Sequence, residues 1–217
     1  MTLCLDIHTH HAAPQPQGVV SVSFKDFDPI ENQFYSVGIH PWTTSSILPT
    51  KEEWEEFERI ASLPCVVAIG ECGIDKIKGG PLFKQLIILN KQIELSEKLG
   101  KPLIIHDVKA HDVIVGLKRD LKPLQKWAIH GFRGKPSVAK MMSDAGIYLS
   151  FGEKFNPETP VTLPDNFILA ETDESPLTIE EIIANLSTNL GRDVTSLIAA
   201  NTISFLDIKT ITPAFKP

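Results

Sequence analysis

Two histidines and an aspartate occupy alternate positions near the start of the chain, in the run Asp6-Ile7-His8-Thr9-His10. Alternate side chains of an extended chain point to the same face, so Asp6, His8 and His10 are expected to lie together. Two imidazoles at this spacing can hold one divalent cation, and Asp6 can act as a partner behind the ligands. Taken alone, the run fits a polar turn with chance histidines equally well.

More histidines and carboxylates follow short apolar runs later in the chain. They are His40 after the run 34–39, Glu71 after 65–69, His106 after 102–105, His130 after 127–129, and Glu171 with Asp173 after 167–170. In a parallel barrel the C-terminal ends of the strands face one common space, where such enzymes place their sites. Any one of these side chains is better explained as a structural histidine or a helix-capping acid. Their repetition at successive strand ends favours a shared site.

Imidazoles and carboxylates without thiolates are ligands that suit Zn²⁺, Mn²⁺, Ni²⁺ or Fe²⁺, and Mg²⁺ stays open. A carboxylate such as Glu71 can bridge two ions, so one or two ions are expected. Such ions activate a water that attacks phosphorus or a carbonyl carbon, and Asp173 can orient that water and accept its proton. The sequence therefore predicts a metal-dependent hydrolase with Glu71 and Asp173 as catalytic residues.

The elements that must position these residues alternate along the chain. Short, β-branched apolar runs predict buried strands at 3–7, 19–24, 34–39, 65–69, 102–105, 127–129, 147–151 and 167–170. Helical patterns cover 82–99, 110–121 and 136–145, capping boxes at Thr50/Glu53 and Thr178/Glu181 begin two more helices, and Asp193 is expected to cap a last one through 206. This order predicts an α/β fold, a TIM-like (β/α) barrel forming a single domain over 1–217.

The early part of the chain fits this plan less well. The links from 8 to 19 and from 24 to 34 are short for a crossover with its helix, and Pro14, Pro16 and Pro29 oppose helices there. We therefore expect a distorted barrel, open or irregular on that side, with one or two early helices missing or shortened.

Composition narrows the class of protein. The chain has 217 residues, 42% of them hydrophobic and 22% charged, which is typical of a globular domain. It shows no apolar run long enough to span a bilayer, no secretory signal, and three cysteines without a CxxC pair. These features predict a cytoplasmic protein with reduced thiols and no membrane partner, and a monomer is compatible with them. The net charge of −6 argues against a large footprint on duplex DNA, although bound cations would still permit a nuclease.

The motifs, taken in order, resemble the TatD family of metal-dependent hydrolases. They are Asp6-x-His8-x-His10, Gly38-Ile39-His40-Pro41, Ile69-Gly70-Glu71-x-Gly73-Ile74-Asp75, Ile105-His106, His130-x-Phe132-x-Gly134 and Glu171-Thr172-Asp173, with Asn201 and Phe205 resembling the family's closing segment. The resemblance runs from about residue 3 to Phe205. It implies a distorted TIM barrel with a divalent-metal site and deoxyribonuclease activity. The first motif also resembles the PHP phosphoesterases, but the later segments fit that family less well.

The resemblance also implies roles for particular residues. His8, His10, Glu71 and Asp173 would hold a first metal ion, and Glu71, His106 and His130 would hold a second. His40 would lie beside the metal site or contact the substrate.

The surroundings of these motifs depart from the family pattern. Val108 followed by Lys109 replaces a usual arginine, Lys76 follows Asp75, and Gly131-Phe132-Arg133-Gly134 follows His130. Lys76, Lys109 and Arg133 are candidates for holding phosphate oxygens, or are ordinary surface charges. Trp42 is a candidate for stacking on a base, or packs on the surface.

The expected substrate is DNA, as single strands or ends, or a small phosphoester. A lactone or amide substrate and a non-catalytic barrel are the alternatives.

Overall fold

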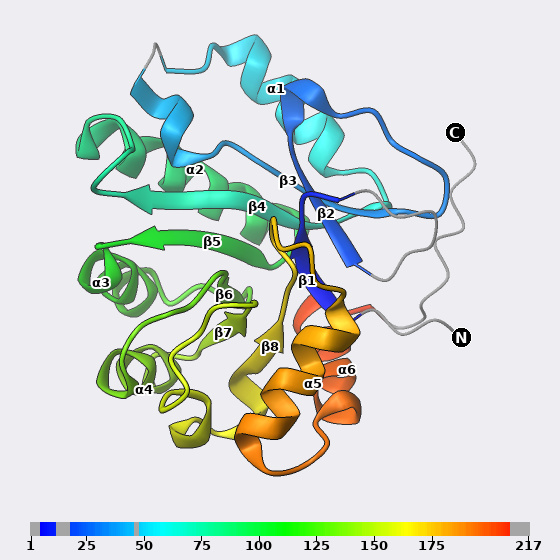
Figure 1. Ribbon diagram of the computed structural model, residues 1–217. Helices are drawn as coiled ribbons and strands as arrows, with labels where there is room; N and C mark the ends of the chain where they lie inside the picture. Colours follow the sequence, from blue (N-terminus) through cyan, green and yellow to red (C-terminus); the bar gives the residue numbers. More distant parts are fainter. Residues whose placement is uncertain (1–4, 12–17, 46–47, 209–217) are drawn as a thin grey trace.

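Eight parallel strands form a closed barrel in the computed structural model, which describes residues 5–11, 18–45 and 48–208 (Figure 1). They follow chain order around the ring: β1 (Asp6–Thr9), β2 (Gly18–Ser23), β3 (Phe34–Gly38), β4 (Val66–Asp75), β5 (Leu103–Val108), β6 (Trp127–Ile129), β7 (Ile147–Phe151) and β8 (Ile168–Ala170). The outer α-helices of the described part are α1 (Lys51–Ala61), α2 (Leu82–Leu99), α3 (His111–Leu121), α4 (Pro136–Asp144), α5 (Ile179–Leu190) and α6 (Thr195–Leu206). The TIM-like fold is confirmed.

The early side of the barrel differs from the expectation in one respect. The ring is closed there, because β1 pairs with both β2 and β8, so the expectation of an open wall is wrong. Irregularity is present as a register shift between Asp6 and Thr9 of β1. The link from β2 to β3 contains only a short 3-10 helix, Phe24–Asp26, in place of a crossover helix. Most of the link from β1 to β2 lies outside the described residues.

Strand β4 is longer than the sequence indicated. The apolar run ends at Ile69, but the strand continues through Asp75 and therefore contains Glu71. Gly70 and Gly73 interrupt the apolar pattern in this stretch. In the structure Gly73 has a φ of 141° and lies against the backbone of His106, where a side chain would not fit. The glycine thus lets β4 pair closely with β5.

The core has two layers. Inside the barrel, apolar side chains such as Ile7, Ile104 and Leu169 pack with Phe205, which α6 brings to one end of the ring. A larger layer lies between the strands and the outer helices. The Asn201 side chain donates hydrogen bonds to the carbonyls of Asp165 and Ile168, and so fastens α6 beneath β8.

Helix ends follow the local signals closely. The capping boxes of Thr50 with Glu53 and of Thr178 with Glu181 are both present. At α6 the expected cap is displaced: Val194 is the residue before the helix, while the Asp193 carboxylate accepts hydrogen bonds from the Thr195 backbone N–H and hydroxyl. No helix within the described ranges is long and apolar enough to cross a membrane.

Candidate metal centre

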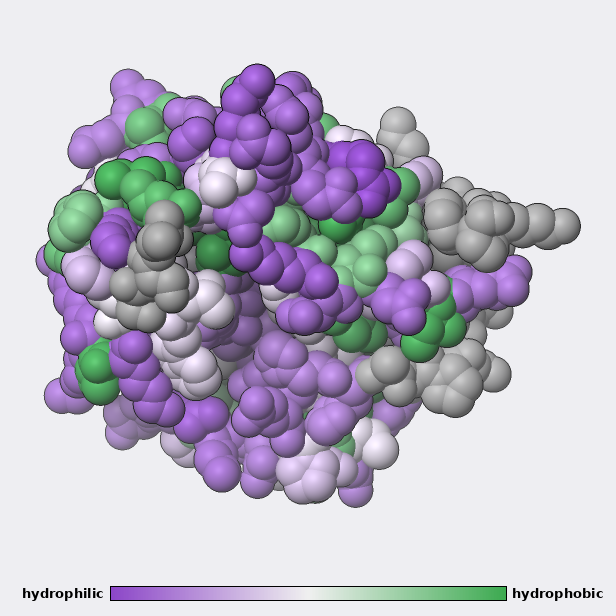
Figure 2. Space-filling model, turned by 90° about the horizontal axis from the view of Figure 1, so that it is seen from above, coloured by the Kyte–Doolittle hydropathy of each residue, from purple (hydrophilic) through white to green (hydrophobic). Residues whose placement is uncertain are grey.

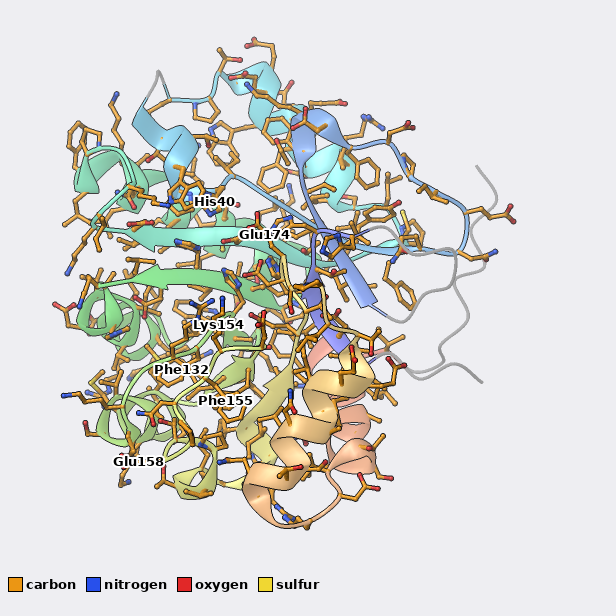
Figure 3. All side chains as sticks on the ribbon, in the orientation of Figure 1. His40, Phe132, Lys154, Phe155, Glu158 and Glu174 are labelled. Atoms are coloured by element: carbon orange, nitrogen blue, oxygen red, sulfur yellow. The ribbon has the colours of Figure 1, made fainter. Side chains whose placement is uncertain are left out.

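A cavity of about 840 Å³ opens at the C-terminal ends of the strands. Five of the six predicted metal ligands line it together with His40: His10, Glu71, His106, His130 and Asp173. The sixth, His8, is fully buried beside Glu71 and Asp173. His40 and Glu174, both labelled in Figure 3, line this cavity and come from the segments after β3 and after β8. Residues far apart in sequence therefore meet at one end of the barrel.

One carboxylate oxygen of Glu71 is the centre of a group of imidazoles. Glu71 Oε1 lies 2.9 Å from His40 Nε2, 2.6 Å from His106 Nδ1 and 2.8 Å from His130 Nε2. The two ring nitrogens of His106 and His130 are 3.3 Å apart. Glu71 is 8% exposed, so these contacts are made largely out of solvent. Such a set of converging nitrogen and oxygen atoms is chemically suited to a divalent cation.

The other oxygen of Glu71 belongs to a second group. His8 Nε2 lies 3.5 Å from Glu71 Oε2 and 3.6 Å from Asp173 Oδ1, and His10 Nε2 lies 3.7 Å and 3.6 Å from the same atoms. In tetrahedral coordination with metal–ligand bonds of about 2.0–2.2 Å, two ligand atoms lie roughly 3.3–3.6 Å apart. The fully buried His8 Nε2 has no hydrogen-bond partner among the described residues. The spacing and this unsatisfied nitrogen fit a bound cation.

Backbone contacts fix Asp173 beside the first strand. Its N–H donates to the carbonyl of His8 at 2.9 Å, and its carbonyl accepts from the N–H of His10 at 3.1 Å. Asp173 adopts a φ of 54°, a left-handed conformation that aspartate tolerates better than most residues. The barrel closure between β1 and β8 therefore places this carboxylate next to both histidines.

Glycine is required where β3 approaches Glu71. A Cβ on Gly38 would lie 2.6 Å from the Glu71 carbonyl oxygen and 2.7 Å from the Gly70 carbonyl carbon. The absence of a side chain lets the end of β3 reach β4, and this brings His40, two residues later, onto the Glu71 carboxylate.

Asp75 supports the centre from behind His106. Its Oδ2 lies 3.2 Å from His106 Nε2 and accepts a hydrogen bond of 2.7 Å from the Trp42 indole, while its Oδ1 accepts from the N–H groups of Ile77 and Lys78. These hydrogen bonds outweigh the effect of burial and lower the pKa of Asp75 to about 2. Asp75 lies in one of the motifs found in the sequence, but no role was predicted for it, because its contacts come from segments distant in sequence.

Glu171 lies behind His130 in a similar way. It is fully buried, its Oε1 lies 3.6 Å from His130 Nδ1, and it accepts a hydrogen bond from the Gly131 N–H. Its position directly after β8 and its place in the motif Glu171-Thr172-Asp173 were the sequence signals. Carboxylates in this position orient ligating imidazoles in many metal sites.

Charges within the centre compensate one another. Burial alone would raise the pKa of Glu71, but the charge of His130 and hydrogen bonds from the surrounding histidines hold it well below its usual range. Burial likewise opposes a charge on His130, yet Glu71 and Glu171 raise its pKa well above the ordinary value. Two buried carboxylates thus attract positive charge to this point, which is the electrostatic setting of a cation site.

Asp6 does not share a face with the two histidines. Its carboxylate accepts hydrogen bonds from the N–H groups of His8 and Thr172 and from the Thr172 hydroxyl, and it lines a smaller pocket with Thr9 and His11. The register shift in β1 interrupts the alternation on which the expectation was based. Burial raises the pKa of Asp6 to about 7 in spite of these hydrogen bonds. Through these hydrogen bonds Asp6 connects β1 to the segment that follows β8.

The predicted basic contacts lie outside the cavity. Lys76 is paired with Asp112 at 3.2 Å, and neither Lys109 nor Arg133 is among the cavity-lining residues. Trp42 does line the cavity and is 48% exposed, with Lys78 Nζ 4.5 Å from the centre of its ring. Sequence reasoning missed Lys25, a lining residue that is ion-paired with Glu53.

Comparison with known proteins adds an independent line of argument. A family model described as TatD related DNase matches residues 25–214. A Bacillus subtilis protein named uncharacterized metal-dependent hydrolase YabD is 30% identical over 149 residues, 64% of this chain and 58% of its own length. An Erwinia tasmaniensis protein named 3'-5' ssDNA/RNA exonuclease TatD is 27% identical over 155 residues, 62% of this chain and 59% of its own length.

Among solved structures, the TatD homologue YJJV of Escherichia coli shares the fold. Its TM-score is 0.78 at 18% identity, covering 96% of this chain and 100% of that one. The matches to the curated relatives, by contrast, span less than two thirds of the length of those proteins.

Proposed function

The chain belongs to the TatD family of metal-dependent hydrolases, and from this premise we propose that it hydrolyses phosphoester bonds with the help of one or two divalent cations. The observation that carries the proposal is the position of Glu71. Each of its two carboxylate oxygens faces a separate group of imidazoles, with distances of 2.6 to 3.7 Å. A single buried carboxylate shared in this way is suited to bridging two ions.

The proposed ligands are those expected from the sequence. His8, His10, Glu71 and Asp173 would hold one ion, and Glu71, His106 and His130 would hold the other. His40 contacts the same Glu71 oxygen as His106 and His130, so it either supports the second ion or contacts the substrate. Zn²⁺, Mn²⁺, Ni²⁺, Fe²⁺ and Mg²⁺ remain the candidate ions.

When bound, such ions would neutralise phosphoester oxygens and lower the pKa of a nearby water. The chain's own residues have the remaining tasks. The Asp173 side chain is 31% exposed and lines the cavity, so while Oδ1 faces the proposed ion, Oδ2 can orient an attacking water and take its proton. Asp75 and Glu171 hold the rings of His106 and His130, which keeps the catalytic groups in place.

Nucleic acid is the first candidate substrate. Relatives named 3'-5' ssDNA/RNA exonuclease support it, and Trp42 at the cavity is suited to stacking on a base. A small phosphoester is the second candidate, because the cavity offers few positive charges for a strand of phosphates. Both substrates require the same metal-dependent chemistry.

The proposal is tested by hydrolysis assays on protein that has been stripped of metal and then supplied with each candidate cation. Labelled single-stranded oligonucleotides and small aryl phosphodiesters serve as substrates. We expect cleavage that depends on added metal and falls at least about 100-fold in Glu71→Gln. Glu55→Gln, on the exposed face of α1, is the matched control and should keep full activity. Metal-replete protein that cleaves neither class of substrate would contradict the proposal.

A further inference from the structure

Part of the cavity lining is apolar. Val22, Phe24, Ile39, Leu48 and Ile88 line it, and we call these five residues the apolar wall. Phe24, Ile39 and Ile88 belong to the outer core layer, and Val22 and Leu48 pack against that layer. Because Ile39 directly precedes His40, the wall begins next to the candidate metal centre. Figure 2 views the molecule from the side of α1, where apolar side chains reach the surface in patches between polar ones.

The wall is held in place by buried contacts. The Gln92 side chain accepts a hydrogen bond of 2.9 Å from the Ile39 N–H and donates one of 3.2 Å to the Ile39 carbonyl. The ring of Phe24 packs against Phe57, with centroids 5.1 Å apart. Phe24 lies in the 3-10 helix that replaces a crossover helix, so the shortened link supplies part of the wall. A preformed surface of this kind binds without a large ordering cost.

The charges in the cavity do not match a polyanion. Lys25 is the one lysine or arginine among the described residues that line it, and it is ion-paired with Glu53. Carboxylates of Glu71, Asp173 and Glu174 also line the cavity. Two divalent cations would balance these carboxylates and one phosphoester. Further phosphates of a strand would find no positive partner inside the cavity.

We infer that the apolar wall is a subsite for an uncharged apolar or aromatic group joined directly to the scissile phosphoester. The preferred substrates are then small phosphoesters carrying one such group. This inference rests on the proposed phosphoesterase function and selects between its two substrate classes. The cavity volume of about 840 Å³ accommodates a substrate of this size.

Binding of two phosphonates tests the subsite without requiring turnover. The full chain is loaded with Mn²⁺ and titrated calorimetrically with phenylphosphonate and with methylphosphonate. We expect phenylphosphonate to bind at least about tenfold more tightly, because each buried methylene equivalent is worth roughly a factor of four. Val22→Thr, which preserves shape, and Leu48→Asn should each bring the Kd of phenylphosphonate closer to that of methylphosphonate. Leu124→Asn, at a side chain 89% exposed, is the control and should preserve the ratio.

Equal Kd values for the two phosphonates, or a preference that both wall variants leave unchanged, would overturn the inference. A second measurement compares kcat/KM for a phenyl phosphodiester and a single-stranded oligonucleotide. Faster cleavage of the oligonucleotide would overturn the subsite assignment and leave the phosphoesterase proposal intact. A clear preference for phenylphosphonate without cleavage of any phosphoester would support the subsite and contradict the proposed function.

Discussion

We expect Asp75→Asn to lower the affinity for the proposed ion at Glu71, His106 and His130. The affinity for the ion at His8 and His10 should fall less. Asp75 is 1% exposed, and its carboxylate accepts hydrogen bonds on both oxygens. An asparagine retains the acceptor for the Ile77 and Lys78 N–H groups. Its amide nitrogen, however, would face the Trp42 indole N–H and the His106 ring, where Asp75 Oδ2 now lies.

The magnitude follows from the two contacts that are lost. A buried donor left without its acceptor costs about 1–3 kcal/mol, and partial exposure of Trp42 allows its indole to turn toward water. The main effect should therefore fall on His106, whose ring would lose its fixed orientation. Changes behind a ligating histidine typically lower metal affinity or activity by about 10- to 100-fold. We expect a loss in this range for the second ion.

The assay is metal content by mass spectrometry after dialysis against graded chelator, together with the hydrolysis rate. Asp112→Asn is the matched control, because Asp112 is an exposed partner of Lys76. Trp42→Phe removes only the indole donor and should have a smaller effect in the same direction. Full retention of both ions and of activity in Asp75→Asn would show that Asp75 does not position His106.

Three further changes test the barrel. Asp6→Ala should lower the free energy of unfolding, measured by urea titration, by about 2–4 kcal/mol, because it leaves the buried N–H groups of His8 and Thr172 unpaired. A loss below about 0.5 kcal/mol would contradict the role of Asp6 in closing the ring. Gly38→Ala should lower the free energy of unfolding by about 1–3 kcal/mol and reduce metal binding, since the added Cβ would collide with the backbone at Glu71. Unchanged stability and metal content would show that β3 can move away from β4 without loss. Burial lowers the pKa of Lys101 to about 8, below the value of about 10.4 in an unfolded chain, so its charge opposes folding below pH 8 and the opposition fades as the pH rises toward 10. Between about pH 8 and 10 the free energy of unfolding of the native chain should therefore rise relative to that of Lys101→Met. If the free energies of unfolding of the two proteins change in parallel with pH, the lowered pKa of Lys101 is contradicted.

Features encoded by local sequence were predictable. Thr50 with Glu53 defines a helix start through hydrogen bonds made within four residues, and the structure contains that capping box. The helix Leu82–Leu99 has the predicted bounds, because the left-handed Gly100 ends it. Short apolar runs placed the strands, although their ends were less certain where glycines intervened.

Features that depend on distant contacts were not predictable. Gly73 signals a turn locally, but the strand continues because the backbone of His106 lies against it. Asp75 acquires its role from Trp42 and His106, which the fold brings to it from other strand ends. The face occupied by Asp6 depends on a register shift within β1, and nothing in the run of alternating residues marks that shift.

Basic residues behaved differently from the proposed metal ligands. Lys76 follows a strand end as the histidines do, yet its long side chain reaches Asp112 on the surface. Short side chains at strand ends have little choice of direction, whereas a lysine can extend toward several partners. Position at a strand end therefore predicted which side chains converge as proposed metal ligands, but it did not bring the predicted basic residues into the cavity.

Anomalous X-ray diffraction from crystals grown with saturating Mn²⁺ would test the metal centre most directly. We expect one peak among His8, His10, Glu71 and Asp173 and, where a second ion binds, another beside Glu71, His106 and His130. Manganese peaks only elsewhere on the molecule, with these side chains free of any ion, would contradict it.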